Sequence, residues 1–169
     1  ASGGYAGTVR PLLAVGGNGA TGTSADRARQ GITGRLGLTA DSLFAFVPDL
    51  EVTLGGGYDL FFADTDSLPD ISFLRGGLQL SLPFYASGAS QLYFLLDGGY
   101  ARLRFAAVTF NGITRASRTE NDLYGSAGIG ARWQAQRNLA MFAELRFTDV
   151  SGDVLRDYQF VQLLFGIEL

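Results

Sequence analysis

The sequence predicts an all-β protein: an eight-stranded antiparallel up-and-down transmembrane β-barrel that forms a single domain over residues 1–169. Apolar and polar side chains alternate in segments of about ten residues along the chain, which is the period of a strand with two different faces. Glycine and aromatic residues are abundant, with 24 Gly, 13 Phe and 7 Tyr, as curved sheets with aromatic girdles require. No run of about 18 apolar residues is present, so no helical membrane span is predicted.

The first half of the chain divides into four strands by this alternation. We expect these strands at Gly4 to Val15, Ile32 to Phe46, Leu50 to Phe62 and Leu74 to Leu82. Segments rich in Gly, Ser, Thr, Asp or Pro separate the strands and predict loops or turns. These segments are Gly16 to Arg29, Val47-Pro48-Asp49, Ala63 to Asp70 and Pro83 to Ser90.

The second half of the chain predicts four further strands, at Leu92 to Phe105, Leu123 to Gln134, Leu139 to Thr148 and Tyr158 to Leu169. The connections between them are expected at Ala106 to Asn121, Ala135 to Asn138 and Asp149 to Asp157. The last strand has the clearest alternation, because large apolar side chains keep one parity up to Leu169 while Gln162 and Glu168 keep the other. This pattern predicts an outer face against lipid and a polar interior.

The strand from Leu92 to Phe105 is ambiguous. Arg102 and Arg104 share the parity of its apolar residues, and an arginine facing the lipid midplane costs about 2–4 kcal/mol. One explanation is a bulge at Gly98-Gly99 that reverses the parity. The other is that both arginines lie above the hydrocarbon, in the headgroup layer, and we favour this second explanation.

The alternation assigns individual side chains to the two faces of the barrel. The residues predicted to face lipid are Leu54, Tyr58, Leu78, Leu80, Trp133, Leu145, Leu163, Phe165 and Ile167. The residues predicted to fill the lumen as a network are Arg35, Glu51, Arg75, Gln79, Arg132, Glu144, Arg146, Gln162 and Glu168. Aromatic belts are expected near the loops at Tyr58, Phe62 and Phe147, and near the turns at Phe46, Phe84, Trp133 and Phe165.

This pattern resembles the small eight-stranded outer-membrane barrels of the OmpA/OmpX type. The segment from Tyr158 to Leu169 is similar to the family's C-terminal assembly signal, although the family usually ends in Phe and this chain ends in Leu169. The resemblance implies a monomer in the outer membrane of a Gram-negative bacterium, folded by the outer-membrane assembly machinery, with an interior too full for a wide pore. Because no signal peptide is present, we expect the sequence to be the mature form.

The composition argues against catalysis and against most ligand classes. Histidine and cysteine are absent, which excludes Ser-His-Asp and Cys-His catalysis as well as thiolate and imidazole metal sites. Inward glutamates accompanied by arginines predict ion pairs rather than an acid–base pair. The net charge of −3 argues against a nucleic-acid partner. We therefore expect no enzyme and no cofactor.

Two polar groupings outside the lumen suggest ligands. Asp64, Asp66 and Asp70 are spaced so that they could supply oxygens to Ca²⁺, but a solvated loop is the simpler interpretation. All 13 basic residues are arginine, and Arg102, Arg104, Arg115 and Arg118 surround one long loop. These four could bind lipopolysaccharide phosphates, or they could be scattered solvated residues.

Three functions are consistent with the predicted barrel. The first is a structural, anchoring or surface-interaction role, with the loops at Gly16 to Arg29 and Ala106 to Asn121 as contact surfaces. The second is a narrow channel for ions or small solutes through the arginine-rich lumen. The third is a soluble lipocalin-like barrel, in which the apolar faces would turn inward around a lipid. The partners expected for the first function are outer-membrane lipids and lipopolysaccharide.

Overall fold

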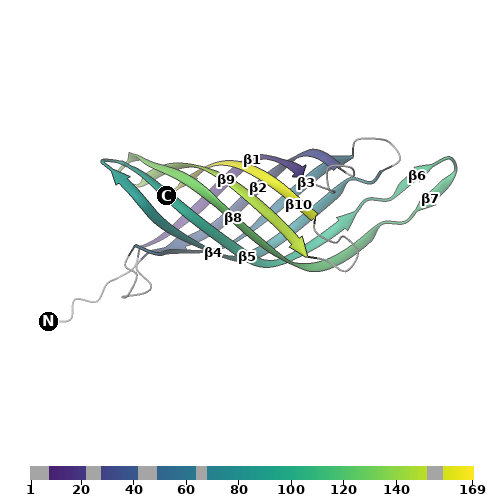
Figure 1. The fold of residues 1–169 in the computed structure, drawn as a ribbon, viewed down its shortest axis with the longest axis horizontal. Helices are drawn as coiled ribbons and strands as arrows, with labels where there is room; N and C mark the ends of the chain where they lie inside the picture. The colour runs from purple at the N-terminus through teal and green to yellow at the C-terminus, as the bar shows by residue number, and fades with distance from the viewer. Residues whose placement is uncertain (1–7, 22–27, 42–48, 64–67, 152–157) are drawn as a thin grey trace.

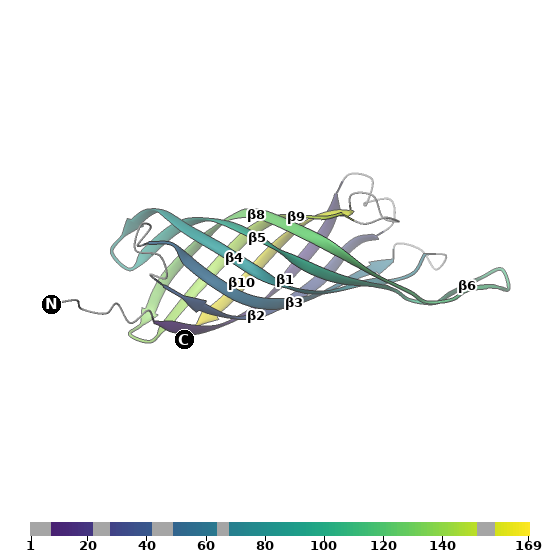
Figure 2. The same cartoon turned by 90° about the horizontal axis from the view of Figure 1, so that it is seen from below.

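The structure is a computed structural model that describes residues 8–21, 28–41, 49–63, 68–151 and 158–169. In these ranges the long strands close into one antiparallel barrel in the order β1-β10-β9-β8-β5-β4-β3-β2 (Figures 1 and 2). The barrel strands are β1 (Val9–Thr21), β2 (Ala28–Ala40), β3 (Glu51–Ala63), β4 (Ile71–Ser87), β5 (Ser90–Phe105), β8 (Arg118–Gln136), β9 (Leu139–Ser151) and β10 (Tyr158–Glu168). The predicted eight-stranded fold is confirmed.

The barrel closes between its first and last strands. β1 pairs with β10 in unbroken register from Leu12 opposite Glu168 to Thr21 opposite Gln159. We call the end that carries the β4–β5 turn, the β8–β9 turn and Leu169 the turn end, and the opposite end the loop end. The parts of the chain that the structure describes contain no helix long and apolar enough to cross a membrane.

The segment from Ala106 to Asn121, predicted as a loop, instead contains a hairpin and the first residues of β8. Strands β6 (Val108–Phe110) and β7 (Ile113–Arg115) pair with each other, and the hairpin projects beyond the loop-end termini of the other barrel strands (Figures 1 and 2). Asn111 and Gly112 form its turn with φ of 49° and 76°, the backbone that a two-residue hairpin turn needs and that this residue pair favours. The Asn-Gly pair is the feature of the sequence from which this hairpin could have been predicted.

Two further connections are shorter than predicted. Gly16 to Thr21 belongs to β1, so the loop expected from Gly16 is wrong over that part. Gly16 allows β1 to approach β10 closely, since a Cβ atom at this position would lie 1.9 Å from the Leu163 carbonyl oxygen of β10. The turn expected over Pro83 to Ser90 is present but is confined to Gly88 and Ala89. Strand β4 continues to Ser87 and contains an irregularity in register between Pro83 and Tyr85.

Strand β5 keeps one parity over its whole length. Gly98 and Gly99 pair in regular register with both neighbouring strands, so the bulge considered for this position is absent. Arg102 and Arg104 therefore lie on the outer face, near the loop end of β5 and level with the start of β4. The regular register excludes the bulge, and the position of both arginines in the headgroup layer stays a prediction.

Candidate functional site: the lumen and the outer wall

The outer wall of the barrel is apolar. All nine side chains predicted to face lipid are solvent-exposed on it: Leu54, Tyr58, Leu78, Leu80, Trp133, Leu145, Leu163, Phe165 and Ile167. Tyr58, Phe62 and Phe147 of the predicted loop-end belt are exposed, as are Phe84, Trp133 and Phe165 of the turn-end belt. Phe46 lies outside the described residues. The wall thus has the composition of a surface that meets lipid.

The loop end of the lumen is filled by aromatic and aliphatic side chains, which the sequence reasoning missed. The ring of Phe61 lies 5.5 Å from that of Phe73, 5.4 Å from that of Tyr158 and 5.0 Å from that of Phe160, in edge-to-face geometry. Ile71, Ala101, Leu103, Tyr124 and Val150 complete this buried cluster. The signal was available, because these residues have the same parity as the polar lumen residues of their strands.

On the turn-end side of the aromatic cluster, Arg75 is hydrogen-bonded to a carboxylate and an amide. Its Nε donates to Asp59 Oδ2 at 2.6 Å, and its Nη2 donates to Gln162 Oε1 at 3.3 Å. The Gln162 amide in turn donates to Asp59 Oδ1 at 2.6 Å and to the Thr33 hydroxyl at 3.1 Å. The Arg75 guanidinium carbon also lies 5.3 Å from the Tyr124 ring centroid. The aromatic and polar layers are thereby joined.

The centre of the lumen is organised around Arg146, which is 1% exposed. Its guanidinium pairs with Glu144 and donates to Asp97 Oδ2 at 3.1 Å and to Gln79 Oε1 at 2.6 Å. Arg35 also donates to Gln79 and lies 3.8 Å from Glu144. The carboxylates receive further bonds from tyrosine hydroxyls, Tyr93 to Glu144 at 2.8 Å and Tyr124 to Asp97 at 3.1 Å.

A second charged cluster occupies the turn end. Arg132 contacts Glu51 with Nη1–Oε1 and Nη2–Oε2 distances of 2.5 Å and 2.7 Å, and lies 3.2 Å from Glu168. Arg10 lies 3.0 Å from Glu51 and 2.8 Å from Glu168, and also pairs with Asp41. Burial raises the pKa of the Asp41 carboxyl above its usual value, and the neighbouring Arg10 guanidinium acts against that shift.

The predicted lumen network is therefore present. All nine of its residues lie inside the barrel, and each contacts at least one other polar lumen residue: Arg35, Glu51, Arg75, Gln79, Arg132, Glu144, Arg146, Gln162 and Glu168. The sequence reasoning missed Arg10, Tyr93 and Asp97. Arg10 belongs to a segment of small residues around Pro11 with weak alternation, and the outward arginines of β5 obscured the inward parity of Tyr93 and Asp97.

The two ligand groupings predicted from the loops have different outcomes. Asp64 and Asp66 lie outside the described residues, and Asp70 accepts a hydrogen bond from the Ala63 amide at 2.8 Å. No cluster of potential metal ligands occurs in the part of the chain that the structure describes. All four arginines, Arg102, Arg104, Arg115 and Arg118, are exposed. The Arg118 side chain also forms an ion pair with Glu120 at 2.7 Å.

The chain is similar in structure to outer-membrane barrels from several bacteria. Neisserial surface protein A matches with a TM-score of 0.66 and 14% identity over 95% of this chain and 96% of that one. A major outer membrane protein of Thermus thermophilus matches with a TM-score of 0.62 and 14% identity, over 95% and 98%. Ail, the attachment invasion locus protein of Yersinia pestis, matches with a TM-score of 0.54 and 15% identity, over 94% and 96%.

By sequence, neither a family model nor a curated protein matches the chain. The similarity is thus one of architecture, and it covers nearly the whole of both partners in each comparison. It agrees with the closed antiparallel barrel, the apolar wall and the filled lumen described above. The chain therefore has the fold of the small eight-stranded outer-membrane β-barrels.

Proposed function

We propose that the protein is an outer-membrane barrel with a structural, anchoring or surface-interaction role rather than a channel or an enzyme. The observation that carries the proposal is the combination of an apolar outer wall with a lumen filled along its length. The apolar wall supports membrane insertion. The aromatic cluster at the loop end and the two charged clusters nearer the turn end support a lumen that is blocked to solutes, because large side chains pack across the interior at each of these levels.

The β6–β7 hairpin is the proposed contact surface. Its cross-strand pairs place Phe110 and Ile113 together on one face, where they are 53% and 71% exposed, while the paired Thr109 and Thr114 hydroxyls lie on the other. Exposed apolar side chains on a projecting element are typical of a surface that binds another molecule. One protein of similar fold is itself described as an attachment invasion locus protein, which supports this assignment.

The proposed partners follow from the proposed location. Outer-membrane lipids would surround the wall, the outer-membrane assembly machinery would insert the barrel, and the exposed arginines at the loop end would contact lipopolysaccharide. We propose a monomer, because β1 and β10 pair with each other within one chain and the barrel has no unpaired edge strand of its own in the described residues.

Quenching of the single tryptophan by lipid tests membrane insertion. Trp133 is 37% exposed on the outer wall near the turn end, so brominated acyl chains should quench most of its fluorescence after the protein refolds into vesicles. The control uses vesicles with the same lipids unbrominated. Absence of quenching in a protein that remains folded and soluble in buffer would instead support the lipocalin-like barrel.

Planar-bilayer conductance tests the channel alternative. With the Phe61, Phe73 and Phe160 rings packed across the loop end of the lumen, the inserted protein should pass almost no current above the bilayer background. The replacement of Phe61 and Phe73 by alanine serves as a comparison, since it thins this layer without touching the charged clusters. Steady single-channel steps from the unaltered protein would refute the proposal that side chains block the lumen.

A further inference from the structure

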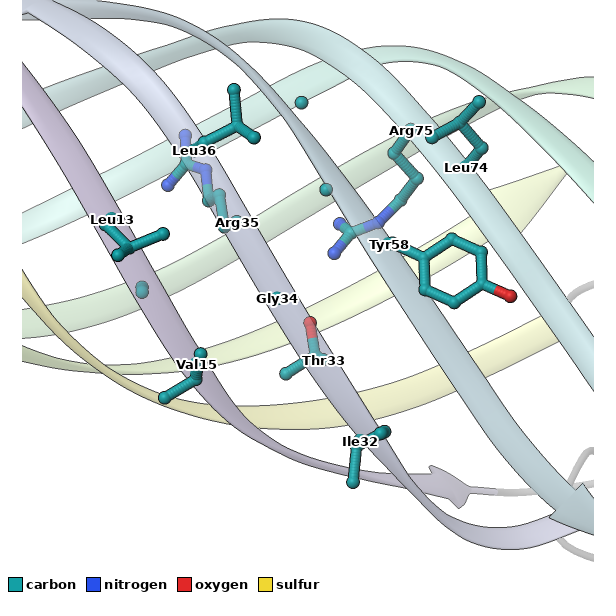
Figure 3. A pocket seen from close by; sticks show the side chains of 13 residues that line it. Leu13, Val15, Ile32, Thr33, Gly34, Arg35, Leu36, Tyr58, Leu74 and Arg75 are labelled. Atoms are coloured by element: carbon teal, nitrogen blue, oxygen red, sulfur yellow. The ribbon is translucent and has the colours of Figure 1, made fainter.

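The outer wall contains a hollow across β1 to β4 that none of the residues described by the structure fills. Its volume is about 630 Å³, and apolar side chains surround it: Leu13, Val15, Ile32, Leu36, Tyr58 and Leu74 (Figure 3). The base of the hollow is formed by backbone, because Gly34 of β2 and Gly56 of β3 occupy outward positions and have no side chains to fill it. A Cβ atom at Gly34 would meet nothing within 4 Å, so packing within the barrel does not explain the glycine there.

The hollow continues toward the loop end. A second hollow of about 520 Å³ shares Leu74 and Arg75 with the first and is lined by Gly76, Tyr100 and Arg102. The strand register connects the two, since Val15 pairs with Gly34, Gly34 with Tyr58, Tyr58 with Leu74, and Leu74 with Arg102. Val15 lies in the middle of β1, whereas Arg102 lies near the loop end of β5, so the path climbs obliquely along the wall.

The part of this path nearest the loop end is positively charged. Arg102 and Arg104 are both exposed on the outer face of β5, and neither has a carboxylate partner among the residues that the structure describes. Their neighbours on β8 are Asn121 and Thr119, which add an amide and a hydroxyl. A guanidinium pair beside neutral hydrogen-bonding groups is suited to phosphate on a sugar-like headgroup.

We propose that this path is a binding site for one lipid A molecule, with an acyl chain in the apolar hollow and a headgroup phosphate on Arg102 and Arg104. The proposal rests on the outer-membrane location proposed above and identifies the lipid that binds this part of the outer wall. A flexible chain fits a narrow, oblique hollow between projecting side chains. A second copy of the barrel fits less well, because a two-fold contact would bring two identical arginine pairs to one apolar interface.

Lipid retention measured by native mass spectrometry tests the site. Barrels are purified in mild detergent from membranes that contain both lipid A and phosphatidylglycerol, and the lipid A bound per barrel is counted. Gly34→Leu fills the hollow and should lower retention about tenfold, since burial of each CH₂ of the chain contributes about 0.8 kcal/mol. Its matched control is Gly125→Leu, at another outward glycine with nothing within 4 Å that does not line either hollow.

The headgroup half of the site has its own variants. Arg102→Gln with Arg104→Gln should also lower lipid A retention about tenfold, because hydrogen bonds between charged groups are the strong ones. Arg137→Gln, at an exposed arginine of the turn end, should leave retention unchanged.

Each outcome separates this inference from the proposed function. Equal retention in Gly34→Leu and Gly125→Leu, retention of phosphatidylglycerol in place of lipid A, or a dimer that Gly34→Leu dissociates would each overturn the lipid A site while the barrel still inserts. Failure of the unaltered protein to insert into vesicles at all, read from Trp133, would overturn the outer-membrane location itself.

Discussion

Replacement of Arg146 by methionine should destabilise the folded barrel by about 3–5 kcal/mol, the cost typical of breaking one side of a buried ion pair. In the centre of the lumen, the guanidiniums of Arg35, Arg75 and Arg146 are balanced by the buried carboxylates Asp59, Asp97 and Glu144. Methionine keeps much of the side-chain volume but removes the charge. Glu144 and Asp97 would then remain buried without their main partner.

Urea unfolding of the barrel in vesicles measures this loss, with Trp133 fluorescence and the gel mobility of the folded form as two readouts. Arg118→Gln is the control at the surface, since the Arg118–Glu120 pair is more than half exposed on the arginine side and should contribute about 0–1 kcal/mol. Arg146→Met combined with Glu144→Gln should recover part of the loss, because charge balance returns. A single Arg146→Met variant as stable as the unaltered protein would mean that the central network does not hold the lumen closed.

The faces of the strands could be predicted from the sequence because a barrel wall imposes a strict period of two. Lipid on one side and a packed lumen on the other leave little choice at positions such as Leu163 and Gln162, and a shift of one residue would exchange the two faces. For this reason the nine predicted lumen residues all lie inside the barrel, and the nine predicted wall residues are all exposed on its outside. Strand β5 keeps the same parity through Arg102, although this places a charged side chain on the outer face.

The ends of the strands and the layers of the lumen could not be predicted in the same way. Gly16 to Thr21 has the composition of a loop, and only the partner strand β10 shows that glycine is needed there for close approach. Parity also gives the inward direction of Phe61 and Phe160 but not their height along the barrel axis. Their gathering into one layer depends on the stagger between strands that are distant in sequence.

Replacement of Gly16 by alanine should prevent proper closure of the barrel, at a cost of about 3 kcal/mol in stability or loss of the folded form. The added Cβ would lie 1.9 Å from the Leu163 carbonyl oxygen and 3.0 Å from the Leu164 Cα, and both atoms belong to the β10 backbone. A backbone cannot yield as the end of a flexible side chain can. Because β1 and β10 form the seam of the barrel, the clash falls where the first and last strands must meet.

The neighbouring glycine provides a matched control in the same strand. Gly17 faces outward, and a Cβ there would lie 3.8 Å from the Gly31 carbonyl oxygen, an ordinary contact distance. Gly17→Ala should therefore fold into vesicles with unchanged yield, while Gly16→Ala should lose most of the folded species on unheated gels. Both substitutions change helix and strand propensity equally, so a difference between them isolates the close approach of β1 to β10. Equal folding of the two variants would show that the seam is wider than the register from Leu12 to Thr21 implies.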